Sequence, residues 1–111
     1  MSNKPIATIE EFEELFNKHD EFLFMKNSLT CPISQAAYEE YETFTKEHQE
    51  VPAYFLTVQD ARPLSNHIAE KYEIKHESPQ AILFSANQPV WNASHWKITA
   101  KSLAETLQLN K

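Results

Sequence analysis

Apolar residues recur every three to four positions in four segments of the chain, and this period predicts amphipathic helices. Thr8 and Glu11 form a capping-box pair at the start of the first segment. Pro32 opens the second segment, and Asp60 is placed to cap the third, with Pro63 tolerated in its first turn. We expect helices over residues 9–18, 32–48 and 99–109, and a helix after Asp60 whose buried side includes Leu64, Ile68 and Tyr72.

Short apolar runs between these helices predict strands. They lie at residues 21–26, 53–58, 81–85 and 90–93, and residues 4–7 are a candidate edge strand. The last two follow each other directly and should form a hairpin through residues 86–89. Strands separated by helices favour a parallel central sheet, to which the hairpin adds an antiparallel strand. The pattern therefore predicts an α/β fold with a mixed central sheet and helices on both faces.

The composition limits the class of protein. The chain has 111 residues, 41% of them hydrophobic, which predicts one domain over residues 1–111 with a single core. A net charge of -6 without a basic run argues against binding to nucleic acid or to an anionic membrane. The apolar runs are too short to span a bilayer, and the first five residues lack the apolar segment of a signal peptide. The absence of glycine excludes Gly-rich phosphate-binding loops.

Cys31 is the only cysteine, so an internal disulfide is impossible and a reducing compartment, the cytoplasm, is expected. Because proline favours the first helical position, Pro32 places Cys31 at the N-cap of the predicted helix. Free backbone N–H groups and the helix dipole favour the nucleophilic thiolate there, with a pKa below the free value of about 8.5. The alternative is an inert buried cysteine. The junction of strand, loop and helix favours the reactive thiol.

Two motifs connect Cys31 to known redox proteins. Residues 30–34, Thr-Cys-Pro-Ile-Ser, resemble the Cys-x-x-Cys site of thioredoxin and glutaredoxin, with Ser34 in place of the second cysteine. Ser78 and Pro79 stand just before the predicted strand at 81–85. In thioredoxin-like folds a proline at this point is cis and lies beside the catalytic cysteine, and the backbone before it pairs with the incoming chain. Outside such a fold, a trans proline at the start of a strand is the better interpretation.

The combined motifs resemble the YtxJ family, the monothiol bacilliredoxins of low-GC Gram-positive bacteria. The resemblance covers nearly the whole chain and implies a thioredoxin-like fold and the thiol bacillithiol as co-substrate, with no bound cofactor. It implies Cys31 as the catalytic residue, supported by Thr30, Pro32, Ser34, Ser78 and Pro79. It rests on Thr-Cys-Pro-Ile-Ser (30–34), Ala-Arg-Pro-Leu-Ser-Asn (61–66), His-Glu-Ser-Pro-Gln-Ala (76–81) and Ala-Ser-His-Trp (93–96).

This resemblance predicts a reaction in which the Cys31 thiolate removes bacillithiol from S-bacillithiolated client proteins. Ser34 cannot attack a disulfide, so bacillithiol itself or another redoxin must resolve the adduct on Cys31. A thioredoxin-like stress or interaction module without turnover, in which Cys31 is only modified, is the main alternative. A cluster-binding role, as in Cys-x-x-Ser monothiol glutaredoxins, is a weaker one, because Pro32 replaces their glycine.

Four further residues are candidates for binding the small thiol. Arg62, the single arginine, is placed to bind the malate of bacillithiol, or it is simply an exposed residue in the first turn of a helix. Trp91 and Trp96 either wall a groove for the thiol or belong to the core, and His95 stands beside Trp96. The histidines show no metal-ligand spacing, so we expect no metal site.

Overall fold

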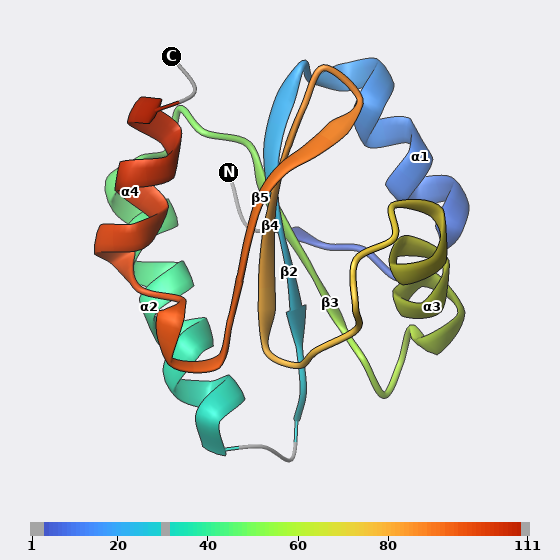
Figure 1. Cartoon of the computed structure of the whole chain (residues 1–111), viewed down its shortest axis with the longest axis horizontal. Coiled ribbons are helices and arrows are strands. Elements are labelled where there is room, and N and C mark those ends of the chain that lie inside the picture. The colour runs from blue at the N-terminus through green and yellow to red at the C-terminus, as the bar shows by residue number, and fades with distance from the viewer. Residues whose placement is uncertain (1–3, 30–31, 110–111) are drawn as a thin grey trace.

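The structure is a computed structural model and describes residues 4–29 and 32–109, without the side chains of residues 108 and 109. Strands and helices alternate along this part of the chain (Figure 1). In order they are β1 (Lys4–Pro5), α1 (Ile9–Lys18), β2 (Glu21–Asn27), α2 (Pro32–Glu47), β3 (Ala53–Thr57), α3 (Arg62–Lys71), β4 (Gln80–Ser85), β5 (Gln88–Ser94), the 3₁₀ helix η1 (His95–Lys97) and α4 (Ala100–Leu109). Each predicted helix and strand is present, with ends shifted by a few residues at most, and η1 was not predicted.

The five strands form one sheet in the order β1-β3-β2-β4-β5. β3 runs parallel to both β1 and β2, whereas β4 is antiparallel to β2 and β5 is antiparallel to β4. The sheet is mixed, as predicted, and the hairpin does supply an antiparallel strand, but that strand is β4. The expectation that β4, linked to β3 by helix α3, runs parallel to the central strands is wrong. Residues 72–79 carry the chain from the far end of α3 back to the lower end of the sheet before β4 begins, so β4 reverses direction (Figure 1).

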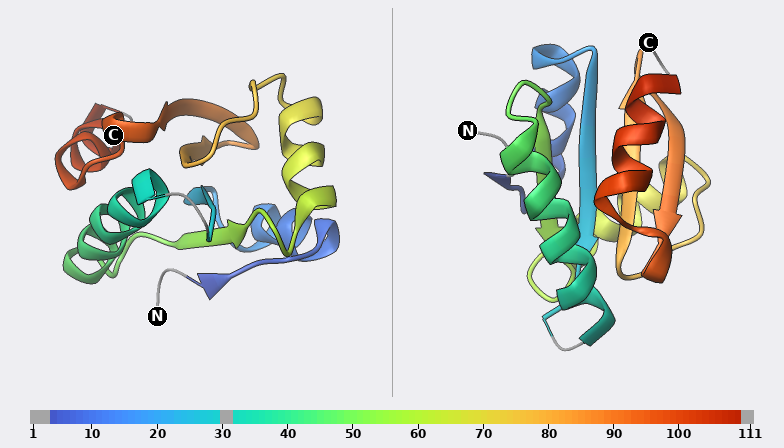
Figure 2. Two further views of the ribbon diagram at one scale, coloured as in Figure 1. Left: turned by 90° about the horizontal axis from the view of Figure 1, so that it is seen from below. Right: turned by 90° about the vertical axis from the view of Figure 1, so that its left-hand side faces the viewer.

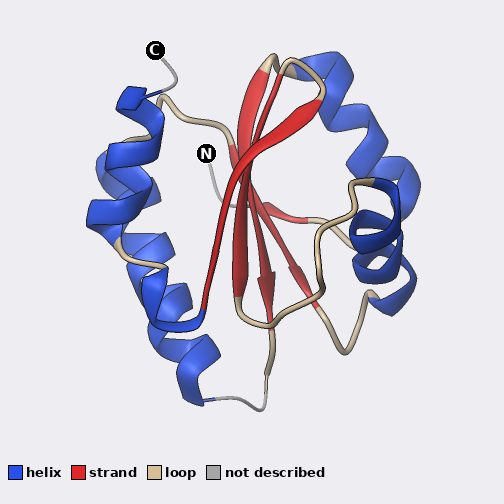
Figure 3. Cartoon of the chain, viewed as in Figure 1, coloured by secondary structure: helices blue, strands red, loops and turns tan. Residues whose placement is uncertain are grey.

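Helices cover both faces of the sheet, as the apolar central strands required. Helices α2 and α4 lie on one face and α1 and α3 on the other (Figures 2 and 3). Leu23 and Met25 of β2 belong to the core on the α2 side, whereas Phe22 and Phe24 belong to the core on the α1 side. Strand β2 is thus buried on both faces, and it delivers the chain to the residues that precede α2.

The predicted capping box at the start of α1 is confirmed. Thr8 Oγ1 accepts a hydrogen bond from the Glu11 N–H at 3.1 Å, and Glu11 Oε1 accepts one from the Thr8 N–H at 3.1 Å. The predicted cap at the start of α3 is wrong, because Ala61 occupies the N-cap and no side chain caps that helix. The Asp60 N–H bonds to the Thr57 carbonyl at 3.0 Å in the preceding turn, which leaves Asp60 one position too early to cap α3.

The hairpin between β4 and β5 turns through Ala86 and Asn87 and is tighter than predicted, because Gln88 and Pro89 already belong to β5. Both turn residues have positive φ, 53° at Ala86 and 66° at Asn87. This left-handed conformation fits the two-residue turns that match strand twist, and asparagine tolerates it. Alanine does not, because its Cβ approaches the following carbonyl oxygen.

Replacing Ala86 with glycine should therefore stabilise the protein. Removal of the Cβ relieves the left-handed strain, and the gain exceeds the extra chain entropy of glycine, leaving about 0.5–1 kcal/mol. Urea unfolding of wild type and Ala86→Gly measures this difference. An unchanged or lower free energy of unfolding for the glycine variant would contradict the assigned turn.

Candidate active site at the start of α2

Four of the predicted site residues lie at one edge of the sheet: Pro32, Ser34, Ser78 and Pro79. β2 and β3 are parallel and both end there, and the antiparallel β4 begins there with Gln80. Helix α2 starts at Pro32 at the same edge (Figure 1). Thr30 and Cys31 lie outside the described residues, so the predicted contact between Cys31 and Pro79 stays a prediction. The fold nevertheless places Pro32, which is bonded to Cys31, and the start of β4 at one edge.

Pro32 is the first residue of α2, as its sequence position predicted. The helix continues for 16 residues, to Glu47. Its first turn contains no acidic residue, so no side-chain carboxylate there opposes an anion at the positive end of the helix dipole. The chain therefore reaches Pro32 at a helix end that favours negative charge.

Ser34 lies in the first turn of α2 and is completely buried. Its Oγ has no hydrogen-bond partner among the described residues. A buried hydroxyl without a partner costs about 1–3 kcal/mol, so such groups are normally satisfied. Within the described residues, the Ser34 hydroxyl therefore keeps an unused donor close to the start of α2.

Other buried polar atoms at this edge are also unpaired within the described part of the chain. Sequence reasoning missed two of these residues, Asn27 and Gln80, although an amide side chain at the end of an apolar strand was a visible signal. Asn27 ends β2 and Gln80 begins β4, and because these strands are antiparallel both residues lie at the same end of the sheet. The unpaired atoms are Asn27 Oδ1, Ser34 Oγ, Ser78 Oγ and Gln80 Oε1.

The bond between Ser78 and Pro79 is cis, as the family resemblance predicted. Pro79 is buried, and its carbonyl accepts a hydrogen bond from the His95 N–H at 3.1 Å. Within the described residues, the N–H and carbonyl of Ser78 make no backbone hydrogen bond. The segment before β4 thus presents free backbone groups of the kind that can pair with another chain.

The structure brings together two of the four predicted thiol-binding residues. His95 and Trp96 line a groove of about 300 Å³ against Ala36, Glu39 and other residues of α2 and the segment after η1. Trp96 is 70% exposed, so its indole is available as a wall of this groove. The groove lies about one to two turns along α2 from Pro32.

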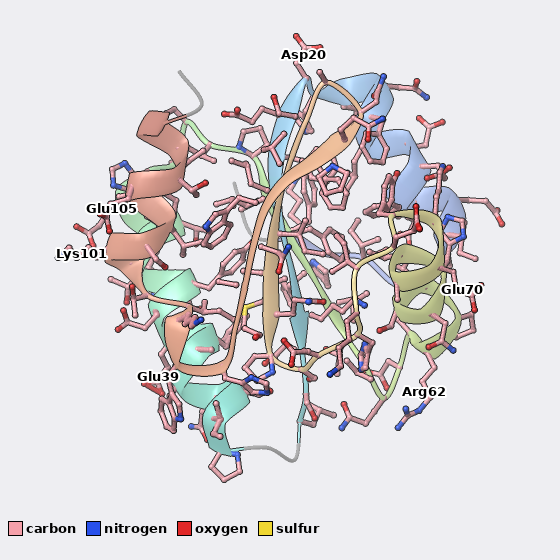
Figure 4. The ribbon with its side chains drawn as sticks, in the orientation of Figure 1. Asp20, Glu39, Arg62, Glu70, Lys101 and Glu105 are labelled. Atoms are coloured by element: carbon pink, nitrogen blue, oxygen red, sulfur yellow. The ribbon has the colours of Figure 1, made fainter. Side chains whose placement is uncertain are left out.

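The other two predicted residues lie elsewhere. Trp91 is half-buried and packs against the core on the α2 side, which supports the core interpretation for this tryptophan. Arg62 is the exposed first residue of α3 and points away from the sheet, on the opposite side from Glu39 of the groove (Figure 4). Arg62 therefore does not share a site with Trp96.

Lys26 is a buried charged residue that sequence reasoning missed. It is the last residue of the predicted strand at 21–26, and in the structure it lies inside β2 with 0% exposure. Its Nζ donates to the Ser65 carbonyl at 3.0 Å and lies 3.2 Å from His76 Nδ1. Burial lowers the pKa of Lys26 to about 8, and burial and the Lys26 charge also lower the pKa of His76.

The described part of the chain contains neither a metal-binding cluster nor a membrane-spanning helix. Within residues 4–29 and 32–109, no group of three or more metal-ligating side chains is positioned to hold an ion. None of the helices in these ranges combines the length and apolar character needed to cross a membrane.

Comparison with solved structures agrees with this architecture. A protein with a thioredoxin fold, described as a candidate oxidoreductase, is 38% identical, with a TM-score of 0.89 over 95% of this chain and 93% of its own. Thioredoxin from Fasciola hepatica shares the fold at 20% identity, with a TM-score of 0.78 over 97% of this chain and 99% of its own. Thioredoxin from Plasmodium falciparum does so at 14% identity, with a TM-score of 0.76 over 98% of each chain.

Fold and sequence together define a thiol oxidoreductase of the thioredoxin class. A model of the monothiol bacilliredoxin BrxC family matches residues 4–103. The chain belongs to this family, which confirms the resemblance drawn from its motifs.

Proposed function

We propose that this chain removes bacillithiol from S-bacillithiolated proteins in the cytoplasm by a monothiol mechanism. The Cys31 thiolate attacks the bacillithiol sulfur of the mixed disulfide, the client leaves as its thiolate, and Cys31 retains bacillithiol. The thiolate of a second bacillithiol, or of another redoxin, then attacks the bacillithiol sulfur of the adduct. The bond to Cys31 breaks, which restores the Cys31 thiolate and releases bacillithiol disulfide or a redoxin–bacillithiol mixed disulfide. The protein needs no bound cofactor for either exchange.

One observation carries most of this proposal: Ser34 takes the place of a second cysteine, and its buried hydroxyl is unpaired within the described residues. It lies one turn into a helix that begins directly after Cys31. A hydroxyl there supports a thiolate by donating to it, but it cannot resolve a disulfide. That combination fits one exchange per Cys31 followed by resolution from outside.

The groove beside Trp96 is the better candidate for the small thiol in this proposal. Its exposed indole offers an apolar face for a sugar ring, and His95 and Glu39 offer polar contacts. Arg62 lies on the other side of the sheet and is not assigned to the same ligand.

Replacing Ser34 with alanine should slow the reaction without abolishing it. A hydrogen bond to a charged group contributes about 1.5–3 kcal/mol, and with a discount for exposure its loss should raise the pKa of Cys31 by about one unit. Thiolate absorbance followed against pH gives the pKa, and transfer kinetics give the rate. If both stay at wild-type values, Ser34 has no part in the chemistry.

Turnover separates the proposal from the non-catalytic alternative. Purified protein, a bacillithiolated client and an excess of free bacillithiol should release many equivalents of client thiol per Cys31. Release of no more than one equivalent, with Cys31 modified, would instead support an interaction module. A coloured, iron-containing purified protein would favour the cluster-binding alternative.

A further inference from the structure

Lys26 is a buried cation that has no anionic partner among the described residues. It occupies a central strand with 0% exposure, and no carboxylate lies within ion-pair distance of its Nζ in the described part of the chain. Burying an ammonium without a counter-charge is costly. An apolar side chain at position 26 would match the buried apolar residues that precede it in β2 better than a lysine does. A lysine at this position therefore calls for a reason beyond packing.

The hydrogen bonds of Lys26 join three separate parts of the fold. Its Nζ donates to the Ser65 carbonyl of α3 at 3.0 Å and lies 3.2 Å from Nδ1 of His76, in the segment between α3 and β4. Ser65 Oγ lies 3.2 Å from the same Nδ1. An ammonium has only donors, so His76 Nδ1 accepts and the imidazole is neutral, with its proton on Nε2. Lys26 thereby ties the segment to both β2 and α3.

This segment leads directly into the cis proline. His76 lies two residues before Ser78, and Gln80, the first residue of β4, pairs with Lys26 in the sheet register. Gln80 Nε2 also donates to the Lys75 carbonyl at 3.0 Å. The backbone of Ser78 therefore lies between two residues that are both held by Lys26 or its strand: His76, through its hydrogen bond to Lys26, and Gln80, through the pairing of β4 with β2.

We propose that Lys26 is a positioning residue, whose hydrogen bond to His76 fixes the backbone at residues 77–79 for pairing with the client chain. This inference rests on the proposed function, because it concerns the docking of the client at the redox site. The role requires a neutral His76. A protonated imidazole cannot accept at Nδ1 and repels the ammonium.

The charges around this contact are few. His76 faces Lys26, Arg62 and Glu77, of which only Glu77 is an anion. The register partners of Lys26 in the adjacent strands are uncharged, Leu56 in β3 and Gln80 in β4. Client-dependent exchange should therefore weaken on the acid side, as His76 gains a proton below pH 6.5.

The test compares a reaction that needs docking with one that does not. The docking reaction is exchange with a bacillithiolated peptide, and the other is alkylation of Cys31 by iodoacetamide. Lys26→Met should lower kcat/KM for the peptide about tenfold and change the alkylation rate less than about twofold. Lys75→Met, which removes an exposed lysine side chain from the same segment, is the matched control and should change neither. Equal losses in both reactions, or no loss in either, would overturn the proposal.

A second pair of variants keeps the test decisive if Lys26→Met fails to fold. His76 is exposed, so its replacement should not prevent folding. His76→Leu removes the hydrogen-bond acceptor and should lower kcat/KM for the peptide as Lys26→Met does. His76→Gln keeps an acceptor oxygen and should retain most of the wild-type kcat/KM. Equal activity of these two variants would overturn the positioning role. The His76 pKa, measured by NMR, should rise in Lys26→Met because the ammonium is removed, and an unchanged value would refute the contact. The NMR measurement tests the contact between Lys26 and His76 without any exchange reaction. If the wild-type protein showed no exchange with the peptide, that result would refute the proposed function and not this contact.

Discussion

Replacing Cys31 with serine is expected to abolish the release of bacillithiol from client proteins. A serine hydroxyl stays protonated at neutral pH and does not exchange with disulfides, so no residual reaction by the same route is possible. Release of client thiol from a bacillithiolated protein, followed at equal concentrations of the two proteins, measures the loss. The fall should be at least about a thousandfold, since the nucleophile itself is removed.

The control for this variant is Ser34→Ala, which keeps the nucleophile and should retain a measurable rate. If Cys31→Ser still released client thiol at a comparable rate, the reaction would not pass through this residue. The thiol oxidoreductase chemistry of the family would then need another explanation in this chain.

Replacing Phe12 with alanine is expected to cause the largest loss of stability. Phe12 is completely buried between α1 and the sheet, and its ring meets those of Phe24 at 5.1 Å, Phe16 at 5.3 Å and Phe84 at 5.6 Å, all edge to face. Truncating such a residue costs about 3–5 kcal/mol, from lost transfer free energy and the cavity left behind. For a domain of this size, that is a large part of the free energy of unfolding.

Thermal unfolding followed by circular dichroism should show a fall in Tm of about 12–20 °C for Phe12→Ala. Trp96→Ala is the matched control, because it removes an aromatic ring that is 70% exposed and should change the stability by less than about 0.5 kcal/mol. A comparable loss in both variants, or a loss below about 1 kcal/mol in Phe12→Ala, would contradict the assigned core.

Local sequence signals predicted the elements of this fold well, because each has a local physical cause. The capping box at Thr8 needs only Glu11 three residues later, and Pro32 pre-sets the first turn of its own helix. The apolar run of β2 predicted a strand buried on both faces, and the structure places a core on each side of it. The cis bond before Pro79 was different in kind, since it came from the resemblance to a family.

The features that escaped prediction depend on contacts between distant residues. The direction of β4 is set by the path of residues 72–79. The pattern of apolar and polar residues in this segment gives no sign that the strand after it runs antiparallel to β2. The burial of Lys26 depends on acceptors 39 and 50 residues away, in Ser65 and His76. Trp96 is brought beside α2 by a short 3₁₀ helix that the alternation of apolar residues could not predict. These tertiary relations needed the folded structure.

Intact mass spectrometry tests the central claim most directly. Reduced protein is mixed with one equivalent of a bacillithiolated client, the reaction is quenched in acid, and both masses are recorded. The account predicts that the client loses one bacillithiol while this chain gains one, and that the gain is absent in Cys31→Ser. A client that keeps its bacillithiol while the wild-type chain stays unmodified would contradict the account.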